Sequence, residues 1–354
     1  MTDDATPDPG APALHRRRPR YRGKHPRQFA EKYKEHDPEH YSADVAKVLA
    51  AGKTPAGMHR PIMVAEIVEV LEPRPGDVAV DCTLGYGGHA REILARIQLG
   101  GRLLGLDTDP IELPKTETRL RALGFGPESL SIMRTNFAGL AKILATAAVS
   151  GADLILADLG VSSMQLDNPA RGFSFKVEGP LDMRMNPRRG EPASRLLENI
   201  TPAGLAALLE ENADEPHSSR LAEALAGGAF STTTGLTDAI RRRLPNLRAE
   251  DRELSVRRVF QALRIAVNDE FSALETFLRS LPSCLNPDGR VAILSFHSGE
   301  DRRIKKAFEK GRREGQYAEI AQDVIRPTAA ECRANPRCTA AKLRWARRAP
   351  VAMH

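Results

Sequence analysis

The feature that most constrains the fold of this chain is a series of short apolar runs that alternate with helical patterns. The runs predict strands at residues 78–80, 101–107, 130–133, 154–156 and 290–296. Apolar residues with helical spacing predict helices at residues 62–71, 89–97, 137–144, 271–281 and 301–308. This alternation is typical of a parallel, doubly wound α/β sheet. In such a sheet, ligands bind where the carboxyl ends of the strands meet polar loops.

Two of these strand ends predict a nucleotide-type cofactor. Asp81 precedes the glycine turn Gly85-Tyr-Gly87-Gly88, and Asp107 ends the next strand 26 residues later. Glycines let a ligand approach the backbone, and an acidic residue at this place accepts hydrogen bonds from ribose hydroxyls. NAD and S-adenosylmethionine both meet these conditions. Asp81 favours S-adenosylmethionine, because a carboxylate attracts a methionine amino group and repels a pyrophosphate. Phe137, after the third strand, either packs on the adenine or belongs to the core.

A third strand end carries the candidate reactive loop. Residues 158–167 read Asp-Leu-Gly-Val-Ser-Ser-Met-Gln-Leu-Asp and follow the apolar run at 154–156. The exocyclic amine of a base is a poor nucleophile, because its lone pair is delocalised into the ring. An enzyme that methylates it needs acceptors that align the amine and take up its proton. Asp158, Ser162 and Ser163 are therefore the candidate catalytic residues. The alternative is that Asp158 only caps its own loop.

The charge distribution favours a polyanionic partner. The net charge is +6, but residues 1–60 carry 12 Lys and Arg against 8 Asp and Glu, and residues 301–350 carry 14 against 6. Basic ends on a mildly acidic body indicate nucleic acid. The alternative is that these segments are solvated tails. Residues 1–28 are rich in proline and arginine and are expected to be disordered.

Composition limits the remaining classes. With 354 residues, 41% of them hydrophobic and 28% charged, the chain has the composition of a soluble globular protein. It has no apolar run long enough for a membrane span and no apolar signal core, so we expect a cytoplasmic protein without a membrane partner. The four cysteines lack zinc-site spacing, and we expect no metal. The sequence leaves the oligomeric state open.

A block without strands interrupts the α/β pattern. Amphipathic helices are predicted at residues 202–211, 219–225, 236–244 and 255–267. We interpret residues 169–267 as an inserted helical domain that recognises RNA. Four residues near its start are candidate RNA contacts, through charge and stacking: Arg171, Phe173, Phe175 and Arg184. The alternative is that these residues pack the insertion against the main domain.

Several sequence motifs of the chain together resemble those of a known family. They are His59-Arg60-Pro61-Ile62, Asp81-x-Thr83-x-Gly85-x-Gly87-Gly88-His89, Leu106-Asp107-x-Asp109-Pro110, the loop 158–167, Arg171-Gly-Phe-Ser-Phe175, Gly179-Pro-Leu-Asp-Met-Arg-Met185, Phe260-Gln-Ala-Leu-Arg264, and Ser295-Phe-His-Ser-x-Glu-Asp-Arg302. In this order, from about residue 57 to 347, they resemble the 16S rRNA cytosine-N4-methyltransferases (RsmH, also called MraW).

The resemblance implies a Rossmann-like class I methyltransferase with an inserted helical domain. It implies methyl transfer from S-adenosylmethionine to N4 of a cytidine in the decoding region of 16S rRNA, free or in the small ribosomal subunit. By motif match the cofactor contacts are Gly87, Gly88, His89, Asp107, Phe137, Asp158 and Gln165. The methyltransferase domain would comprise residues 57–168 and 268–354, with a basic, largely disordered extension at residues 1–56.

The chain departs from the family pattern at three single positions. Met164, Asn186 and Gly299 stand where the family usually has Pro, Asp and Leu. The departures leave the cofactor motif intact and put the target more in doubt than the reaction. A noncatalytic ribosome-assembly factor and a paralogue that methylates another RNA cytosine are the alternatives. A DNA amino-methyltransferase is disfavoured, because Asp158-Leu-Gly-Val is not the Pro-Pro-aromatic loop of those enzymes.

Overall fold

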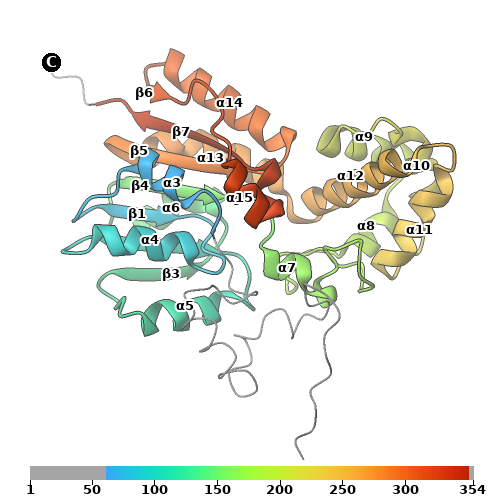
Figure 1. The fold of residues 1–354 in the computed structure, drawn as a ribbon, viewed down its shortest axis with the longest axis horizontal. Helices are drawn as coiled ribbons and strands as arrows, with labels where there is room; N and C mark the ends of the chain where they lie inside the picture. The colour runs from blue at the N-terminus through green and yellow to red at the C-terminus, as the bar shows by residue number, and fades with distance from the viewer. Residues whose placement is uncertain (1–60, 351–354) are drawn as a thin grey trace, which may run out of the picture. The chain divides into compact units, whose positions relative to one another are not determined.

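A seven-stranded sheet organises the α/β part of the chain in the computed structural model, which describes residues 61–350 (Figure 1). The strand order is β3-β2-β1-β4-β5-β7-β6. The strands are β1 (Val78–Asp81), β2 (Arg102–Asp107), β3 (Leu130–Arg134), β4 (Ala152–Asp158), β5 (Leu285–Ser295), β6 (Tyr317–Ile320) and β7 (Lys342–Arg348). β1 to β5 are parallel, which confirms the predicted doubly wound class. The predicted extension at residues 1–56 lies outside the described residues.

Helices cover both faces of this sheet. One face packs on α3 (Val64–Leu71), α4 (Gly88–Ile97) and α5 (Leu113–Ala122). The other packs on α6 (Leu140–Thr146), α13 (Glu270–Cys284) and α14 (Ser298–Arg313). Successive strand residues alternate between the two layers: Ala79 packs on the first side and Val80 on the second. Burial on both faces explains why the strands are nearly continuous apolar runs.

The carboxyl end of the sheet collects the polar strand ends. β1 pairs with β2 through Asp81 and Gly105, and β4 pairs with β5 through Asp158 and Leu294. The loops after β1, β2, β4 and β5 therefore leave the sheet at the same edge. This is the edge at which parallel sheets bind ligands.

Among the strands and the helices that cover the sheet, the structure differs from the expected elements in three places. β5 starts at Leu285, five residues before the strand predicted at residues 290–296; Asp288 has a φ of 62° there, and the pairing with β4 shifts register between Ala152 and Leu154. β6 and β7 run antiparallel and were not predicted, because arginines obscure the alternation in Lys342–Arg348. α5 was not predicted either, since it buries only Leu113, Thr116 and Leu120.

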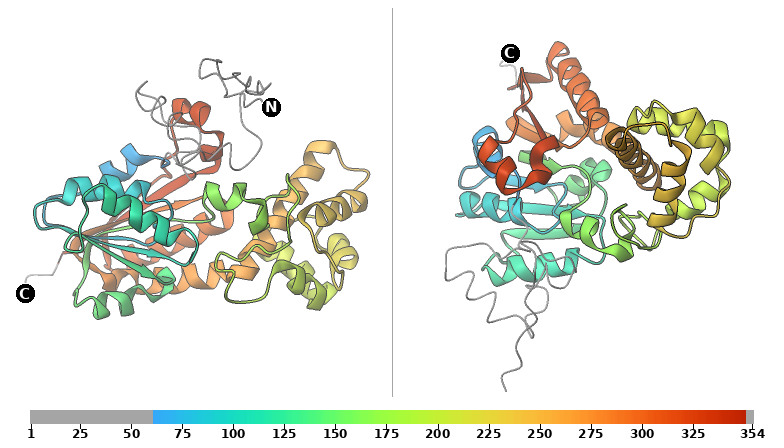
Figure 2. Two further views of the ribbon diagram at one scale, coloured as in Figure 1. Left: turned by 90° about the horizontal axis from the view of Figure 1, so that it is seen from below. Right: turned by 45° about the vertical axis from the view of Figure 1, so that its right-hand side comes forward.

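The predicted helical block is present between β4 and β5. It consists of α8 (Ala193–Asn199), α9 (Pro202–Ala213), α10 (Ser218–Leu225), α11 (Thr233–Arg243) and α12 (Ala249–Asn268). Figure 2 shows these helices packed against one another. Their buried side chains form a hydrophobic cluster separate from the two clusters on the sheet. Apolar residues thus stabilise this block from within, as expected for a segment that buries its own core.

Short elements complete the chain around the strand ends. They are η2 (Phe137–Gly139), α7 (Ser163–Asp167), η3 (Pro169–Arg171), α15 (Ala329–Ala334) and η4 (Pro336–Ala340). Within residues 61–350, no helix combines the length and the apolar character needed to cross a bilayer.

Candidate active site

The glycine turn between β1 and α4 is fixed by close packing. Gly85 and Gly87 have φ angles of +48° and +80°, which favour glycine. A Cβ on Gly87 would lie 2.9 Å from Cγ2 of Thr116, and one on Gly88 would lie 3.0 Å from Cγ of Pro61. These glycines are therefore required by neighbouring protein atoms, and they keep the turn close to the sheet edge.

Asp107 connects this turn to the end of β2. Its Oδ2 accepts the backbone N–H of Gly85 and its Oδ1 accepts that of Asp109, both at 2.8 Å. Burial raises the pKa of Asp107, and these two donors oppose the shift. Each carboxylate oxygen keeps further lone pairs, so Asp107 can still accept hydrogen bonds from ribose hydroxyls.

Asp109 holds the loop 158–167 against β2, a role that the sequence did not predict. It is 1% exposed, and its Oδ2 accepts Nε2 of Gln165 and Nη1 of Arg171, each at 2.8 Å. Asp109 was visible in the Leu106-Asp107-x-Asp109-Pro110 motif, but no role followed from spacing. Its buried ion pair with Arg171 fixes the segment after α7 to the carboxyl edge of the sheet.

The two serines of the loop differ in what they contact. Oγ of Ser162 accepts the backbone N–H of Gln165 at 3.2 Å, and Oε1 of Gln165 accepts the backbone N–H of Ser162 at 2.9 Å. This reciprocal pair is a capping box that begins α7. Ser163 is half-buried in the first turn of α7. The geometry makes Ser162 a structural residue, and the catalytic role of both serines stays a prediction.

Asp158 ends β4 with an unsatisfied carboxyl group. Its Oδ1 is enclosed and finds no hydrogen-bond partner among residues 61–350. Burial, followed by the charge of Glu300, raises the pKa of Asp158 to about 7. Its backbone N–H donates to Oγ1 of Thr83 at 2.6 Å, which anchors the strand end. A buried acceptor that titrates near neutral pH is what a general base requires.

His89 lies beside this carboxyl group without neutralising it. Nε2 of His89 is 2.9 Å from the carbonyl oxygen of Ile62, which assigns the ring proton to Nε2. Nδ1 then lies 3.8 Å from Oδ2 of Asp158 as an acceptor. Burial lowers the pKa of His89, so the imidazole is neutral at pH 7.

Asp81 adds a further acidic group at the end of β1. It is 2% exposed, and burial raises its pKa to about 6, helped by the charges of Asp158 and Asp107. Three carboxyl groups thus meet at adjacent strand ends. A cation placed among them would offset their mutual repulsion. S-adenosylmethionine carries a sulfonium and an ammonium group, so the charge of this site fits that cofactor.

Comparison with known proteins decides the family. The sequence model of the MraW methylase family matches residues 56–349. The chain belongs to the MraW methylase family. It is 52% identical over 340 residues to "Ribosomal RNA small subunit methyltransferase H 2" of Alkaliphilus metalliredigens, covering 93% of this chain and 97% of that protein. It is 48% identical over 342 residues to "Ribosomal RNA small subunit methyltransferase H 1" of Lachnoclostridium phytofermentans, covering 94% and 93%. The resemblance seen in the motifs is confirmed.

Phe137, another residue marked by the MraW family pattern, lies at the start of η2. Its ring meets Phe277 of α13 edge-to-face, with 5.3 Å between centroids. It packs against the core on the α13 side and remains half-buried. Both interpretations from the sequence therefore stay open, because the ring contacts the core and the residue is not fully buried.

The four predicted RNA contacts of this MraW family member have different surroundings. Arg171 is 7% exposed and donates to the carbonyls of Arg184 and Met185 besides its pair with Asp109. Phe173 is 6% exposed in the core of the helical block. Arg184 makes an ion pair with Asp182 at 2.7 Å, and Phe175 remains half-buried. The contacts of Arg171 and Phe173 are those of packing residues, and an RNA role for the four stays a prediction.

The end of β5 brings an aromatic ring to the reactive loop. A Cβ on Gly160 would lie 3.9 Å from Cδ2 of Phe296 and 3.8 Å from Nη1 of Arg264. Arg264 is held by two hydrogen bonds to Glu270, both 2.8 Å. Phe296 is half-buried, and its backbone N–H donates to Oε2 of Glu300. The loop 158–167 has no aromatic residue. The ring of Phe296 is therefore the aromatic surface that these contacts place beside the loop.

One departure from the MraW family pattern has a packing cause. A Cβ on Gly299 would lie 2.7 Å from Cζ of Phe271 and 3.2 Å from Nδ1 of His297. The Phe271 ring therefore fills the place of a side chain at position 299. Asn186 accepts the backbone N–H of Arg188 at 3.0 Å within its own turn. Met164 is 2% exposed, and nothing else in the structure explains why it replaces Pro.

Proposed function

We propose that this protein transfers a methyl group from S-adenosylmethionine to N4 of a cytidine in small-subunit rRNA. The observation that carries the proposal is the Oδ1 atom of Asp158, which is enclosed and has no hydrogen-bond partner among residues 61–350, on a carboxyl group whose pKa is raised to about 7. Membership of the MraW methylase family supports the reaction class. The names of the relatives support the RNA substrate.

The acidic strand ends would hold the cofactor, which supplies an electrophilic methyl group on a positively charged sulfur. Asp107 would accept the ribose hydroxyls, and Asp81 would attract the ammonium group. The turn at Gly87 and Gly88 would let the cofactor lie against the backbone. Phe137 would contact the adenine with the exposed part of its ring. Gln165 would act by holding the loop through its bonds to Ser162 and Asp109.

Asp158 would accept the proton that N4 releases. N4 would form its bond to the methyl carbon as the sulfur–methyl bond breaks and S-adenosylhomocysteine leaves with the electron pair; positive charge then develops on N4, and its N–H group becomes acidic. Oδ1 of Asp158 has no competing donor among residues 61–350, so it is free to accept that N–H group. The neutral His89 beside it adds no positive charge that would weaken this base. The carboxylate thereby aligns the amine and removes its proton.

Phe296 would hold the target base. A cytidine in folded RNA must leave its stack to reach a methyl donor at the sheet edge, and an aromatic ring offsets part of the lost stacking. Phe296 lies beside Gly160, and Gly160 follows Asp158 by two residues in the chain. We propose a cytoplasmic enzyme, with the helical block at residues 169–267 as the part that recognises RNA.

The test is methyl transfer to three substrates from labelled S-adenosylmethionine. They are small ribosomal subunits that lack the modification, naked small-subunit rRNA, and duplex DNA. Nucleosides from each digest would be identified by mass. N4-methylcytidine from a ribosomal substrate alone supports the proposal. Cofactor binding without transfer to any substrate would contradict it and favour a noncatalytic assembly factor.

A further inference from the structure

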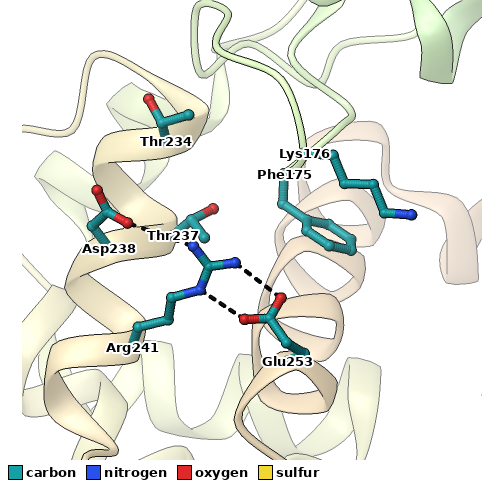
Figure 3. Close-up of a pocket in the computed structure, with 7 residues that line it drawn as sticks. All are labelled: Phe175, Lys176, Thr234, Thr237, Asp238, Arg241 and Glu253. Atoms are coloured by element: carbon teal, nitrogen blue, oxygen red, sulfur yellow. Dashed lines mark hydrogen bonds and ion pairs between the residues drawn. The ribbon is translucent and has the colours of Figure 1, made fainter. Parts of the chain in front are cut away.

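The helical block contains a pocket that the proposed reaction does not use. It has a volume of about 360 Å³, which falls in the range of pockets that hold small ligands. Its lining residues are Phe175, Lys176, Thr234, Thr237, Asp238, Arg241 and Glu253. Figure 3 shows that they come from α11, from α12 and from the loop before α8. None of them belongs to the strand ends of the sheet.

An ion pair fixes one side of the pocket. Nε and Nη2 of Arg241 donate to the two carboxylate oxygens of Glu253 at 2.7 and 2.9 Å, joining α11 to α12 (Figure 3). Nη1 of Arg241 lies 3.6 Å from Oδ1 of Asp238. Two carboxylates thus hold the guanidinium plane in one orientation. A guanidinium plane is a surface on which an unpaired RNA base can stack.

An aromatic ring forms the opposite side. Figure 3 shows Phe175 across the pocket from α11. Its ring meets Phe260 of α12 edge-to-face, with 5.6 Å between centroids, and is half-buried. The contact with Phe260 holds the ring in place. Aromatic rings are the usual partners of single-stranded bases, because every base has a flat face.

The polar groups at the rim suit a nucleotide better than other small ligands. Asp238 is exposed and can accept N–H groups from a base edge, and the Thr234 hydroxyl can donate or accept. Lys176 is exposed and can pair with a phosphate. The lining carries two positive side chains, Lys176 and Arg241, and two negative ones, Asp238 and Glu253, so it has no excess positive charge that would hold a free anion. A base is neutral and carries its phosphate at a distance, so it matches this arrangement.

The pocket is also tied to the reactive edge of the sheet. Phe175 follows Arg171 by four residues, a span of at most about 14 Å. Arg171 is held at Asp109, which also binds Gln165 of the reactive loop. Between them, Phe173 is buried in the hydrophobic cluster of the block. A base in the pocket would therefore be positioned relative to Asp158.

We propose that this pocket binds one unpaired base of the RNA substrate, at a nucleotide other than the methylated cytidine. Asp238 at its rim favours a base that presents N–H donors. The proposal rests on the proposed function, because it takes RNA as the substrate. It assigns a second contact that sets which cytidine reaches Asp158.

The test compares Phe175→Leu with Phe230→Leu in the full chain. Phe230 is half-buried and packs against the same hydrophobic cluster, but it does not line the pocket. The measured quantities are the Kd for small subunits that lack the modification and the Kd for S-adenosylmethionine. Ultraviolet crosslinks between RNA and protein would be mapped by mass spectrometry. We expect Phe175→Leu to weaken subunit binding about 5- to 100-fold with unchanged cofactor affinity. Phe230→Leu should bind like the wild type.

The crosslinks locate the contact independently of turnover. We expect a nucleotide adduct on the peptide with Phe175 and Lys176 in the wild type, and its loss in Phe175→Leu. Equal subunit affinity of the two variants, or no adduct on this peptide, would overturn the pocket proposal. A wild type that binds and crosslinks RNA but transfers no methyl group would overturn the proposed function alone. A wild type that neither binds nor methylates RNA would overturn both.

Discussion

Nδ1 of His89 faces Oδ2 of Asp158 at 3.8 Å, and the two groups do not form a charged pair. The proton of the neutral ring is on Nε2, which donates to the carbonyl of Ile62. Nδ1 therefore meets the carboxyl group as a second acceptor. This arrangement leaves Asp158 without a cation from His89, and it explains why burial can raise the pKa of that carboxyl group to about 7.

Because of Asp158, the free energy of unfolding of the cofactor-free protein should fall as the pH becomes alkaline. The pKa of Asp158 is raised in the folded state from 3.8 to about 7, so the folded state binds its proton more tightly than the unfolded state does. The stability from this group is fully present below pH 3.8 and is lost as the pH rises through 7. Asp158→Asn does not titrate. Its free energy of unfolding relative to the wild type should rise by about 2 to 3 kcal/mol between pH 5 and pH 8. Urea denaturation measures this difference, and a difference independent of pH would contradict the raised pKa.

The acidic strand ends should discriminate the charged cofactor from its neutral product. S-adenosylmethionine carries a sulfonium that S-adenosylhomocysteine lacks, while both have an ammonium group. Because the pKa of Asp81 is raised to about 6 and that of Asp158 to about 7, both carboxyl groups lose charge as the pH falls. Calorimetry should show that affinity for S-adenosylmethionine falls by about tenfold or more from pH 8 to pH 5.5, and that the affinity for the product falls less. Parallel pH dependences would contradict a sulfonium site here.

The residues next to apolar runs were predictable from the sequence, and those defined by distant contacts were not. Asp81, Asp107 and Asp158 follow strands, so the pattern alone marked the ligand edge. The role of Asp109 depends on Gln165 and Arg171, which lie 56 and 62 residues away in the chain. The hydrophobic pattern of a short segment carries no information about contacts between residues so far apart in the chain.

Side-chain burial also could not be predicted from the spacing of residues in the sequence. Arg171, Phe173 and Phe175 lie on one short motif, yet of these three Phe175 alone lines the pocket of the helical block. Charge and aromatic character suggested RNA contacts for all three, because composition does not report burial. The neighbourhood of Gly160, Phe296 and Arg264 likewise joins three segments that only the folded chain brings together.

Arg171 should stabilise the protein through Asp109. Replacing it with Met leaves the side chain of Asp109, which is 1% exposed, without its ion-pair partner. We expect Arg171→Met to reduce the free energy of unfolding by about 3 to 5 kcal/mol. The control is Arg189→Met in the same segment, where an exposed side chain should change stability by less than about 0.5 kcal/mol. Loss of RNA affinity with full stability in Arg171→Met would show an RNA contact instead.

Phe296 should act on the RNA and not on the cofactor. Phe296→Leu keeps an apolar side chain but removes the ring, so turnover with small subunits at low substrate concentration should fall about 5- to 100-fold. Cofactor affinity should not change. Phe125→Leu is the control, because Phe125 belongs to the hydrophobic cluster against which Phe296 packs. An equal effect of both substitutions would assign Phe296 to core packing.

The most direct test of the central claim is the pH dependence of single-turnover methyl transfer to small subunits lacking the modification. Wild-type protein and Asp158→Asn would be compared at saturating S-adenosylmethionine, with N4-methylcytidine identified by mass. For the wild type we expect the rate to rise with pH and to level off at or below about pH 7, because the raised pKa of Asp158 is lowered again by the bound cation. Asp158→Asn should lack this rise and lose about 100-fold or more in rate. A variant with the wild-type rate and pH profile would contradict Asp158 as the proton acceptor.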